Sequence, residues 1–154
     1  MKILDLIPAG GIVDDLRSET KDGVLRELSD AVCRAVPGLS PEHLASVLMD
    51  RESLGSTGIG EGVAIPHGKM PAIDRLVAAF GRSRGGVQFA SLDGKPARLF
   101  FLVVAPESNS AGMHLKALAR ISRLVKDERF RRRLLEAEGI EGITQVLREE
   151  DENA

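Results

Sequence analysis

Aromatic residues and cysteine are scarce in this chain of 154 residues. Five Phe and no Trp or Tyr argue against binding of single-stranded nucleic acid, because proteins of that class stack bases on aromatic rings. The single cysteine, Cys33, excludes an internal disulfide and suits a reducing compartment. We therefore expect a cytoplasmic protein whose core is built from Leu, Val, Ile and Ala.

Long apolar runs and an excess of one charge are also missing. The longest run, Leu99 to Ala105, is far shorter than the roughly 20 residues that span a bilayer. Asp5 and Pro8 interrupt the apolar start of the chain, so a signal peptide is not expected. The net charge of -2 gives no overall attraction to nucleic acid or membrane. The sequence thus predicts one soluble domain without direct membrane insertion and without a nucleic-acid partner.

Apolar spacing indicates helices, then strands, then helices. After a candidate cap at Thr20, apolar residues recur every three or four positions from Lys21 to Val36, which predicts a helix. Ser40-Pro41 is typical of an N-cap followed by proline in the first turn of a second helix. Further helices are expected near 115–125, 130–135 and 140–147, and extended segments at 12–16, 63–65, 76–82, 87–89 and 98–105. This order predicts an α/β (α+β) single domain, with a mixed parallel and antiparallel sheet of about five strands flanked by helices on both sides.

Charge is uneven near the end of the chain. Residues 116–133 carry eight basic and two acidic side chains, a net +6, whereas residues 134–154 carry one basic and seven acidic ones, a net -6. Segments of opposite charge so close together usually form solvated helix faces that offset one another. We expect that arrangement rather than a nucleic-acid patch, because clustered positive charge alone is not a reading motif.

His67 follows Pro66 at the end of a predicted strand and precedes Gly68. The strand would fix the base of the side chain and the glycines would leave space around it, which suits a nucleophile. Neutral imidazole is abundant near neutral pH. On the residues alone, a histidine that only punctuates a turn is an equal alternative.

Two more residues qualify as site candidates. Arg51 extends the apolar face of the second helix; its guanidinium either reaches solvent or points at an anion near the glycine-rich residues 55–62. His114 starts the third long helix on the line of Leu118, where the helix dipole disfavours an imidazolium. We expect a neutral ring there, the alternative being a core-edge histidine bound to a backbone carbonyl. His43 is expected at the surface.

Several named motifs fail on inspection. The glycines at 58, 60 and 62 follow a helix and precede a strand, the reverse of the dinucleotide-binding order. Gly68-Lys69 lacks the upstream glycine of a Walker A loop, and Met70 stands where Ser or Thr is needed. No histidine has a carboxylate at ligand spacing, and the GxSxG elbow of a hydrolase is missing. The sequence therefore predicts no nucleotide, no other cofactor and no metal.

The segment 51–68, RESLGSTGIGEGVAIPHG, resembles the active-site signature of the phosphotransferase-system (PTS) enzyme IIA domains of the fructose/mannitol type, type 2. The resemblance continues through DGKP at 93–96 and HLKALARISRL at 114–124, and it is strongest to the nitrogen-regulatory enzyme IIA, a stand-alone cytoplasmic protein. It implies a domain over 1–148, followed by an acidic tail at 149–154 that we expect to be disordered. Arg82 and Arg84 depart from the pattern in a segment beside the expected site, and we expect them to affect partner docking rather than chemistry.

The resemblance implies a phosphocarrier that needs neither metal nor nucleotide. His67 matches the histidine that accepts a phosphoryl group from the phosphohistidine of a small HPr-like protein, His114 the second active-site histidine, and Arg51 the arginine near the phosphate. Because phosphoryl transfer needs alignment and charge stabilisation, Arg51 would neutralise the oxygens and His114 would add a hydrogen bond. Backbone N–H groups of the glycine-rich loop would form a nest for the same oxygens, and the residues concerned are Gly55, Ser56, Thr57, Gly58, Gly60 and Gly62.

The same resemblance leaves two biological roles. A nitrogen-regulatory protein would control partners such as kinases or transporters through its phosphorylation state. The alternative is the sugar-specific IIA component of a fructose or mannitol permease. Cys33 lies in a predicted helix rather than in a phosphocysteine loop, which favours the regulatory role. Which ring nitrogen of His67 would take the phosphoryl group is left open by the residues.

Overall fold

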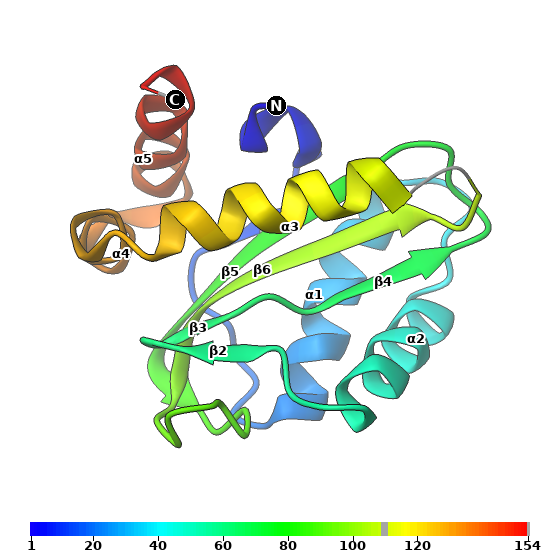
Figure 1. Ribbon diagram of the computed structural model, residues 1–154, viewed down its shortest axis with the longest axis horizontal. Helices are drawn as coiled ribbons and strands as arrows, with labels where there is room; N and C mark the ends of the chain where they lie inside the picture. The colour runs from blue at the N-terminus through cyan, green and yellow to red at the C-terminus, as the bar shows by residue number, and fades with distance from the viewer. Residues whose placement is uncertain (109–110, 154) are drawn as a thin grey trace.

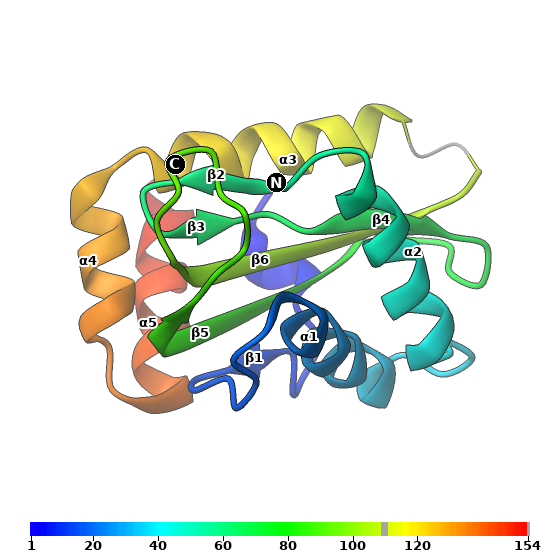
Figure 2. The ribbon, with the colours of Figure 1, turned by 90° about the horizontal axis from the view of Figure 1, so that it is seen from below.

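In the part of the chain that the structure describes, six strands form one mixed sheet through the middle of the molecule, with helices on both faces (Figures 1 and 2). The computed structural model describes residues 1–108 and 111–153. The strand order is β1-β5-β6-β3-β2, and β4 pairs with a later stretch of β6 than β3 does. The strands are β1 Ile12–Val13, β2 Gly58–Gly60, β3 Val63–Ala64, β4 His67–Met70, β5 Val77–Val87 and β6 Ala97–Pro106. The predicted mixed sheet is confirmed.

The helices begin where their capping residues predict. Thr20 accepts a hydrogen bond from the N–H of Gly23 (3.1 Å) at the start of α1, and Ser40 accepts one from the N–H of His43 (3.2 Å) at the start of α2. The helices are the 3-10 helix η1 Ile3–Leu6, α1 Lys21–Ala35, α2 Pro41–Ser53, α3 Ala111–Val125, α4 Glu128–Glu136 and α5 Gly139–Glu152. Within the described residues, none of them combines the length and the apolar character that crossing a bilayer requires.

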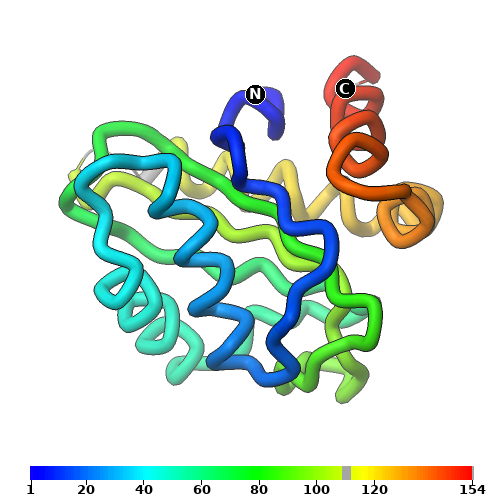
Figure 3. The backbone as a smooth tube through the Cα atoms, turned by 180° about the vertical axis from the view of Figure 1, so that it is seen from behind, coloured from blue at the N-terminus to red at the C-terminus, as the bar shows by residue number. Residues whose placement is uncertain are grey.

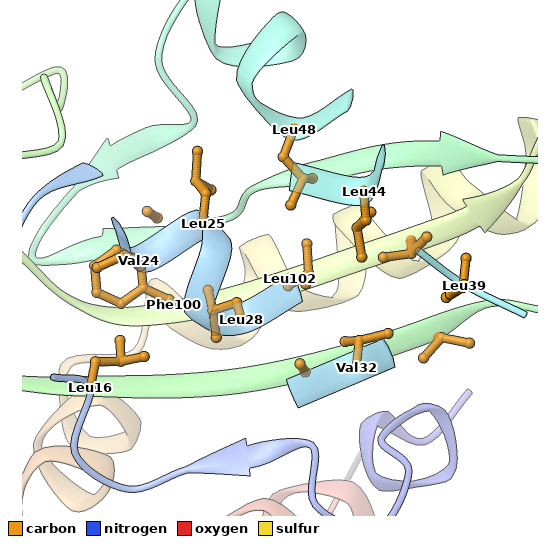
Figure 4. Packing of buried hydrophobic residues seen from close by; sticks show 14 of the residues in the cluster. Leu16, Val24, Leu25, Leu28, Val32, Leu39, Leu44, Leu48, Phe100 and Leu102 are labelled. Atoms are coloured by element: carbon orange, nitrogen blue, oxygen red, sulfur yellow. The ribbon is translucent and has the colours of Figure 1, made fainter. Parts of the chain in front are cut away.

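β6 is buried along almost its whole length and separates two hydrophobic cores. Phe100 and Leu102 belong to the core beneath α1 and α2 (Figure 4), whereas Phe101 and Val103 belong to the core shared with α3, α4 and α5. This alternation is the period of two of a β-strand. His67 is in register with Val103 on the neighbouring strand. Its side chain is therefore on the α3 face of the sheet.

The glycine-rich residues 55–62 are not a loop throughout, contrary to the sequence-based prediction. Residues 58–60 form β2, which pairs antiparallel with β3. The connection turns through Gly60, Glu61 and Gly62, which all have positive φ (94°, 57° and 77°), a conformation that glycine adopts at little cost. Four glycines in eight residues do break a helix, but they also permit a tight hairpin, and helical periodicity cannot distinguish the two.

The acidic end of the chain is ordered, so the predicted disordered tail is wrong for residues 149–153; Ala154 lies outside the described residues. α5 continues to Glu152, and the buried carboxylate of Asp151 accepts hydrogen bonds from the N–H groups of Ile3 (2.9 Å) and Leu4 (3.0 Å). Figure 3 shows η1 and α5 on the same side of the molecule. The carboxylate thus ties the two ends of the chain together.

Basic and acidic segments offset one another, as predicted. Arg120 on α3 forms an ion pair with Asp151 (3.2 Å), and Arg133 on α4 forms one with Glu149 (2.9 Å). Two of the negative residues of α5 therefore face positive residues of the preceding helices. This pairing supplies the physical reason why an acidic C-terminal segment is held in a helix instead of extending into solvent.

Arg82 is 1% exposed, so the expectation that it affects docking is wrong. Its Nε donates to the carbonyl of Asp14 (2.9 Å), and its terminal nitrogen donates to the carbonyls of Leu134 (2.8 Å) and Ala137 (2.6 Å) at the end of α4. Burial lowers the pKa of its guanidinium. The carbonyls at a helix C-terminus carry partial negative charge, so Arg82 acts as a cap between β5 and α4. Arg84 is exposed.

We expect Arg82→Met to lower the free energy of unfolding by about 2–4 kcal/mol, because the buried carbonyls lose a charged donor that methionine cannot replace. Arg84→Met is the matched control: it makes the same exchange two residues away on an exposed side chain and should change stability by less than about 0.5 kcal/mol. Urea unfolding of the two variants measures the difference. Equal stabilities would contradict the capping role.

Candidate functional site

The outer edge of β4 lies between α2 and α3 (Figure 1). Within the described residues β4 pairs only with β6, so this edge carries no further strand. α2 packs closely here because Gly68 has no side chain: a Cβ at that position would lie 2.7 Å from the Cγ1 atom of Val47. The close approach brings the last turn of α2, with Arg51, beside the start of β4.

His67 is the first residue of β4 and is partly exposed. Its Nδ1 lies 2.8 Å from the carbonyl oxygen of Ile65. A carbonyl can only accept a hydrogen bond, so Nδ1 carries the proton and Nε2 holds the free lone pair. The question that the sequence leaves open, which ring nitrogen is available, is answered by a backbone contact two residues upstream.

His114 packs against His67, with ring centroids 5.3 Å apart and an interplanar angle of 65°. The residue is 8% exposed, and burial lowers the pKa of its imidazole, with smaller contributions from His67 and Lys69. The expected neutral ring is therefore favoured. Its Nδ1 is buried and has no hydrogen-bond partner among the described residues, so the alternative of a core histidine held there by a backbone carbonyl is not supported.

The lowered pKa of His114 predicts a loss of stability in acid. The unfolded chain binds a proton near the ordinary histidine pKa of 6.5, whereas the folded chain binds it only at lower pH. The contribution of the neutral His114 ring to the free energy of unfolding is therefore fully present above about pH 7 and is lost as the pH falls below 6.5. We expect His114→Asn to lose less stability than the wild type between about pH 7.5 and about pH 5, measured by urea unfolding. His43→Asn, at an exposed position, should lose as much stability as the wild type over this pH range. A His114→Asn protein that loses as much stability as the wild type would contradict the assignment.

Arg51 lies beside His67 and faces the glycine-rich segment. Its terminal nitrogen donates to the carbonyl of Gly55 (2.9 Å). Arg51 and His67 both line two adjoining hollows of about 170 and 360 Å³. The first also involves Ser56, Thr57, Ile59, Ile65, Leu118 and Ser122, and the second Val47, Asp50, Leu54, Gly68, Lys69 and His114. Of the two orientations considered for Arg51, the one toward an anion site is favoured.

The residues predicted for the loop are divided by the structure. Ser56 and Thr57 line the smaller hollow with His67. Gly58, Gly60 and Gly62 belong to the β2–β3 hairpin, and a Cβ added at each of them would meet Ser91, Asp93 and Pro96, respectively. The hairpin glycines therefore pack against the 88–96 segment.

The expected nest of free N–H groups is not supported for most of this segment. The N–H of Gly55 donates to the carbonyl of Glu52 (3.1 Å), that of Thr57 to the Glu52 carboxylate (3.0 Å), and that of Gly58 to the hydroxyl of Ser56 (3.0 Å). These donors are occupied within the chain. Of the residues expected at the site, Arg51, His67 and His114 are the ones that line the larger hollow together.

Sequence reasoning missed two residues near the site. Lys69 follows His67 by two positions on β4, and the period of two of a strand predicts that both are on one face; it lines the larger hollow. Glu52 is buried directly after Arg51, and nothing in a single sequence signals a buried carboxylate in the last turn of a helix. Within the described residues, no three His, Cys, Asp or Glu side chains gather in a way that suits a metal ion.

Comparison with known proteins places this site in a family. A family model described as "Phosphoenolpyruvate-dependent sugar phosphotransferase system, EIIA 2" matches residues 5–150. A nitrogen regulatory protein of Bradyrhizobium diazoefficiens is 40% identical over 147 residues, which are 96% of this chain and 95% of that protein. A fructose-specific EIIABC component of Bacillus subtilis is 38% identical over 98% of this chain, which spans only 24% of that protein.

Solved structures agree in fold. The nitrogen regulatory protein IIA-Ntr of Neisseria meningitidis superimposes with a TM-score of 0.86 and 34% identity over 93% of this chain and 97% of that one. The IIA mannitol structure of Escherichia coli gives a TM-score of 0.73 and 25% identity over 90% and 96%. The resemblance drawn from the signature is confirmed. The chain belongs to the EIIA 2 family of the phosphoenolpyruvate-dependent sugar phosphotransferase system.

Proposed function

We propose that this protein is a cytoplasmic phosphocarrier of the nitrogen-regulatory type, which accepts a phosphoryl group on Nε2 of His67 from an HPr-like protein. The observation that carries the proposal is the contact between Nδ1 of His67 and the carbonyl of Ile65 (2.8 Å). It leaves the nucleophilic lone pair on Nε2 at a partly exposed strand end beside Arg51.

The transfer step neither takes up nor releases a free proton. The donor histidine, protonated at its other ring nitrogen, leaves as neutral imidazole when its N–P bond breaks. The lone pair of His67 Nε2 forms the new N–P bond, and the His67 ring, still protonated at Nδ1, takes over the positive charge. The carbonyl of Ile65 already accepts the Nδ1 proton and stabilises that cation. The backbone contact thus selects the nucleophile and also favours the product.

The surrounding charges fit the transfer of an anionic group. The Arg51 guanidinium and the Lys69 ammonium both line the larger hollow with His67, and phosphoryl transfer depends on neutralising charge on the equatorial oxygens. Burial lowers the pKa of His114 and so favours its neutral ring, which can donate or accept one hydrogen bond without adding a second cation beside the product ring.

The rim of the site favours a protein as phosphoryl donor. Leu54 and Leu115 are 84% and 65% exposed; Leu54 lines the larger hollow, and Leu115 follows His114 on α3. Ile59 is also exposed beside the smaller hollow. Apolar side chains around a shallow polar centre are typical of a protein–protein interface. Phosphorylation would add about two negative charges at the centre of this surface, which supports regulation of partners such as kinases or transporters.

A sugar-specific IIA role is the second candidate. The 38% identity to the fructose-specific EIIABC component supports it, while the 40% identity to a nitrogen regulatory protein and the TM-score of 0.86 to IIA-Ntr support the regulatory role. The two predict different acceptors. Efficient transfer from this protein to a fructose- or mannitol-type IIB domain would overturn the regulatory assignment.

The test of the proposed function uses the intact protein with ¹⁵N-labelled histidine and a phosphorylated HPr-like protein. We expect one acid-labile, base-stable phosphate per chain, and a ³¹P–¹⁵N coupling to Nε2 of His67. Coupling to Nδ1, or phosphate on another residue, would overturn the assignment of the nucleophile. Potassium phosphoramidate, which transfers its phosphoryl group to imidazole with loss of ammonia, provides a small-molecule donor that needs no docking.

A further inference from the structure

A partly buried ion pair lies under the site. Glu52, in the last turn of α2, has a side chain only 2% exposed, and its carboxylate is 2.8 Å from the ammonium of Lys21 at the start of α1. The same carboxylate accepts hydrogen bonds from the N–H (3.0 Å) and the hydroxyl of Thr57. Neither the acceptance nor the transfer of phosphorus uses this carboxylate.

The network extends to the 88–96 segment. The Lys21 ammonium is 4.7 Å from the centre of the Phe89 ring and 3.4 Å from the Phe89 carbonyl. That carbonyl also accepts a short hydrogen bond from the hydroxyl of Ser56 (2.6 Å). Residues 56 and 57 are thus held from two sides, by Glu52 and by Phe89. A buried carboxylate with three partners costs little only while all of them remain in place.

The held segment contacts Arg51 directly. The guanidinium donates to the carbonyl of Gly55, and the N–H of Gly55 in turn donates to the main-chain carbonyl of Glu52 (3.1 Å). Gly55 has a φ of 146°, which residues with a side chain rarely adopt. The position of the Gly55 carbonyl therefore depends on the residues that anchor the segment on its other side.

We propose that Glu52 is a positioning residue for phosphoryl transfer: through Thr57 it fixes residues 55–57, and through the Gly55 carbonyl it orients the Arg51 guanidinium toward His67. The proposal rests on the proposed function of His67. It explains why a carboxylate is buried directly next to the arginine of the site. It also assigns Lys21 the role of the counter-charge that offsets the desolvation cost of burying the Glu52 carboxylate.

The test is a double-mutant cycle with phosphorylated HPr-like protein as donor. Glu52→Gln should lower the maximal transfer rate roughly tenfold, because the Arg51 guanidinium would no longer be aligned with the phosphoryl group on its way to His67. The KM for the donor should stay near the wild-type value. In an Arg51→Ala background the same substitution should change the rate less than twofold, because the group it orients is gone. A structural defect alone would instead multiply the two losses, and that outcome would overturn the proposal.

Glu42→Gln is the matched control. Glu42 belongs to the same helix and also forms an ion pair, with Arg26 (3.0 Å), but it is exposed. The transfer rate of Glu42→Gln should therefore equal that of the wild type. If Glu52→Gln does not fold, Thr57→Val in the same cycle carries the test, since it removes one donor to Glu52 with little change of shape. Wild-type rates in Glu52→Gln and in Thr57→Val would overturn the positioning role while leaving the function of His67 intact. Absence of phosphate on the wild-type chain would instead refute the proposed function.

Discussion

A His67→Ala chain is expected to take up no acid-labile phosphate from a phosphorylated HPr-like protein, whereas the wild-type chain becomes fully labelled. The reason is that, among the residues that the structure describes, Nε2 of His67 is the nucleophile that combines a free lone pair with an accessible position beside Arg51. The side chain is partly exposed and belongs to an edge strand, so its removal should leave the fold intact. Radiolabelled transfer followed by acid and base treatment measures the effect.

The other two histidines provide matched controls for this result. His43→Ala should be labelled as fast as the wild type, because His43 lies exposed in the first turn of α2. His114→Ala should still be labelled, but more slowly, because the nucleophile remains while a neighbouring hydrogen-bonding ring is lost. Label that persists in His67→Ala, or that vanishes in His43→Ala, would refute the assignment.

The parts of the fold that the sequence predicts are those governed by local patterns. The caps at Thr20 and Ser40 are confirmed because capping involves residues only three positions apart. The buried strand at 98–105 is confirmed because covering a strand on both faces requires an unbroken apolar run. For the site, the signature brought forward His67, Arg51 and His114, and the structure brings these three together at one edge of the sheet.

The features that the sequence did not predict depend on partners far away in the chain. Asp151 is buried because two N–H groups at the opposite end of the chain bind it, and Arg82 is buried because carbonyls more than 50 positions later accept its protons. In composition both are ordinary charged residues, which are usually exposed. The free Nε2 of His67 likewise follows from the path of the backbone at Ile65, which no side-chain pattern encodes.

Replacing Arg51 by alanine is expected to lower the maximal rate of phosphoryl transfer to His67 roughly a hundredfold, the usual cost of losing one positioned charge-stabilising donor. The KM for the donor protein should change less, because the apolar rim at Leu54 and Leu115 is untouched. The transfer rate of Arg51→Lys should lie between those of the wild type and Arg51→Ala, since an ammonium keeps the charge but not the two-pronged geometry of a guanidinium. Rapid-quench kinetics with a saturating donor measures the rates.

The control for charge alone is Arg84→Ala, which removes an exposed guanidinium from β5 and should leave the rate unchanged. The ¹⁵N shifts of His67 should be the same in Arg51→Ala and in the wild type, because the contact of Nδ1 with Ile65 does not involve the arginine. A rate that falls together with a changed His67 tautomer would mean that Arg51 acts by shaping the nucleophile. An unchanged tautomer with a hundredfold slower transfer is what charge stabilisation at the phosphoryl oxygens requires.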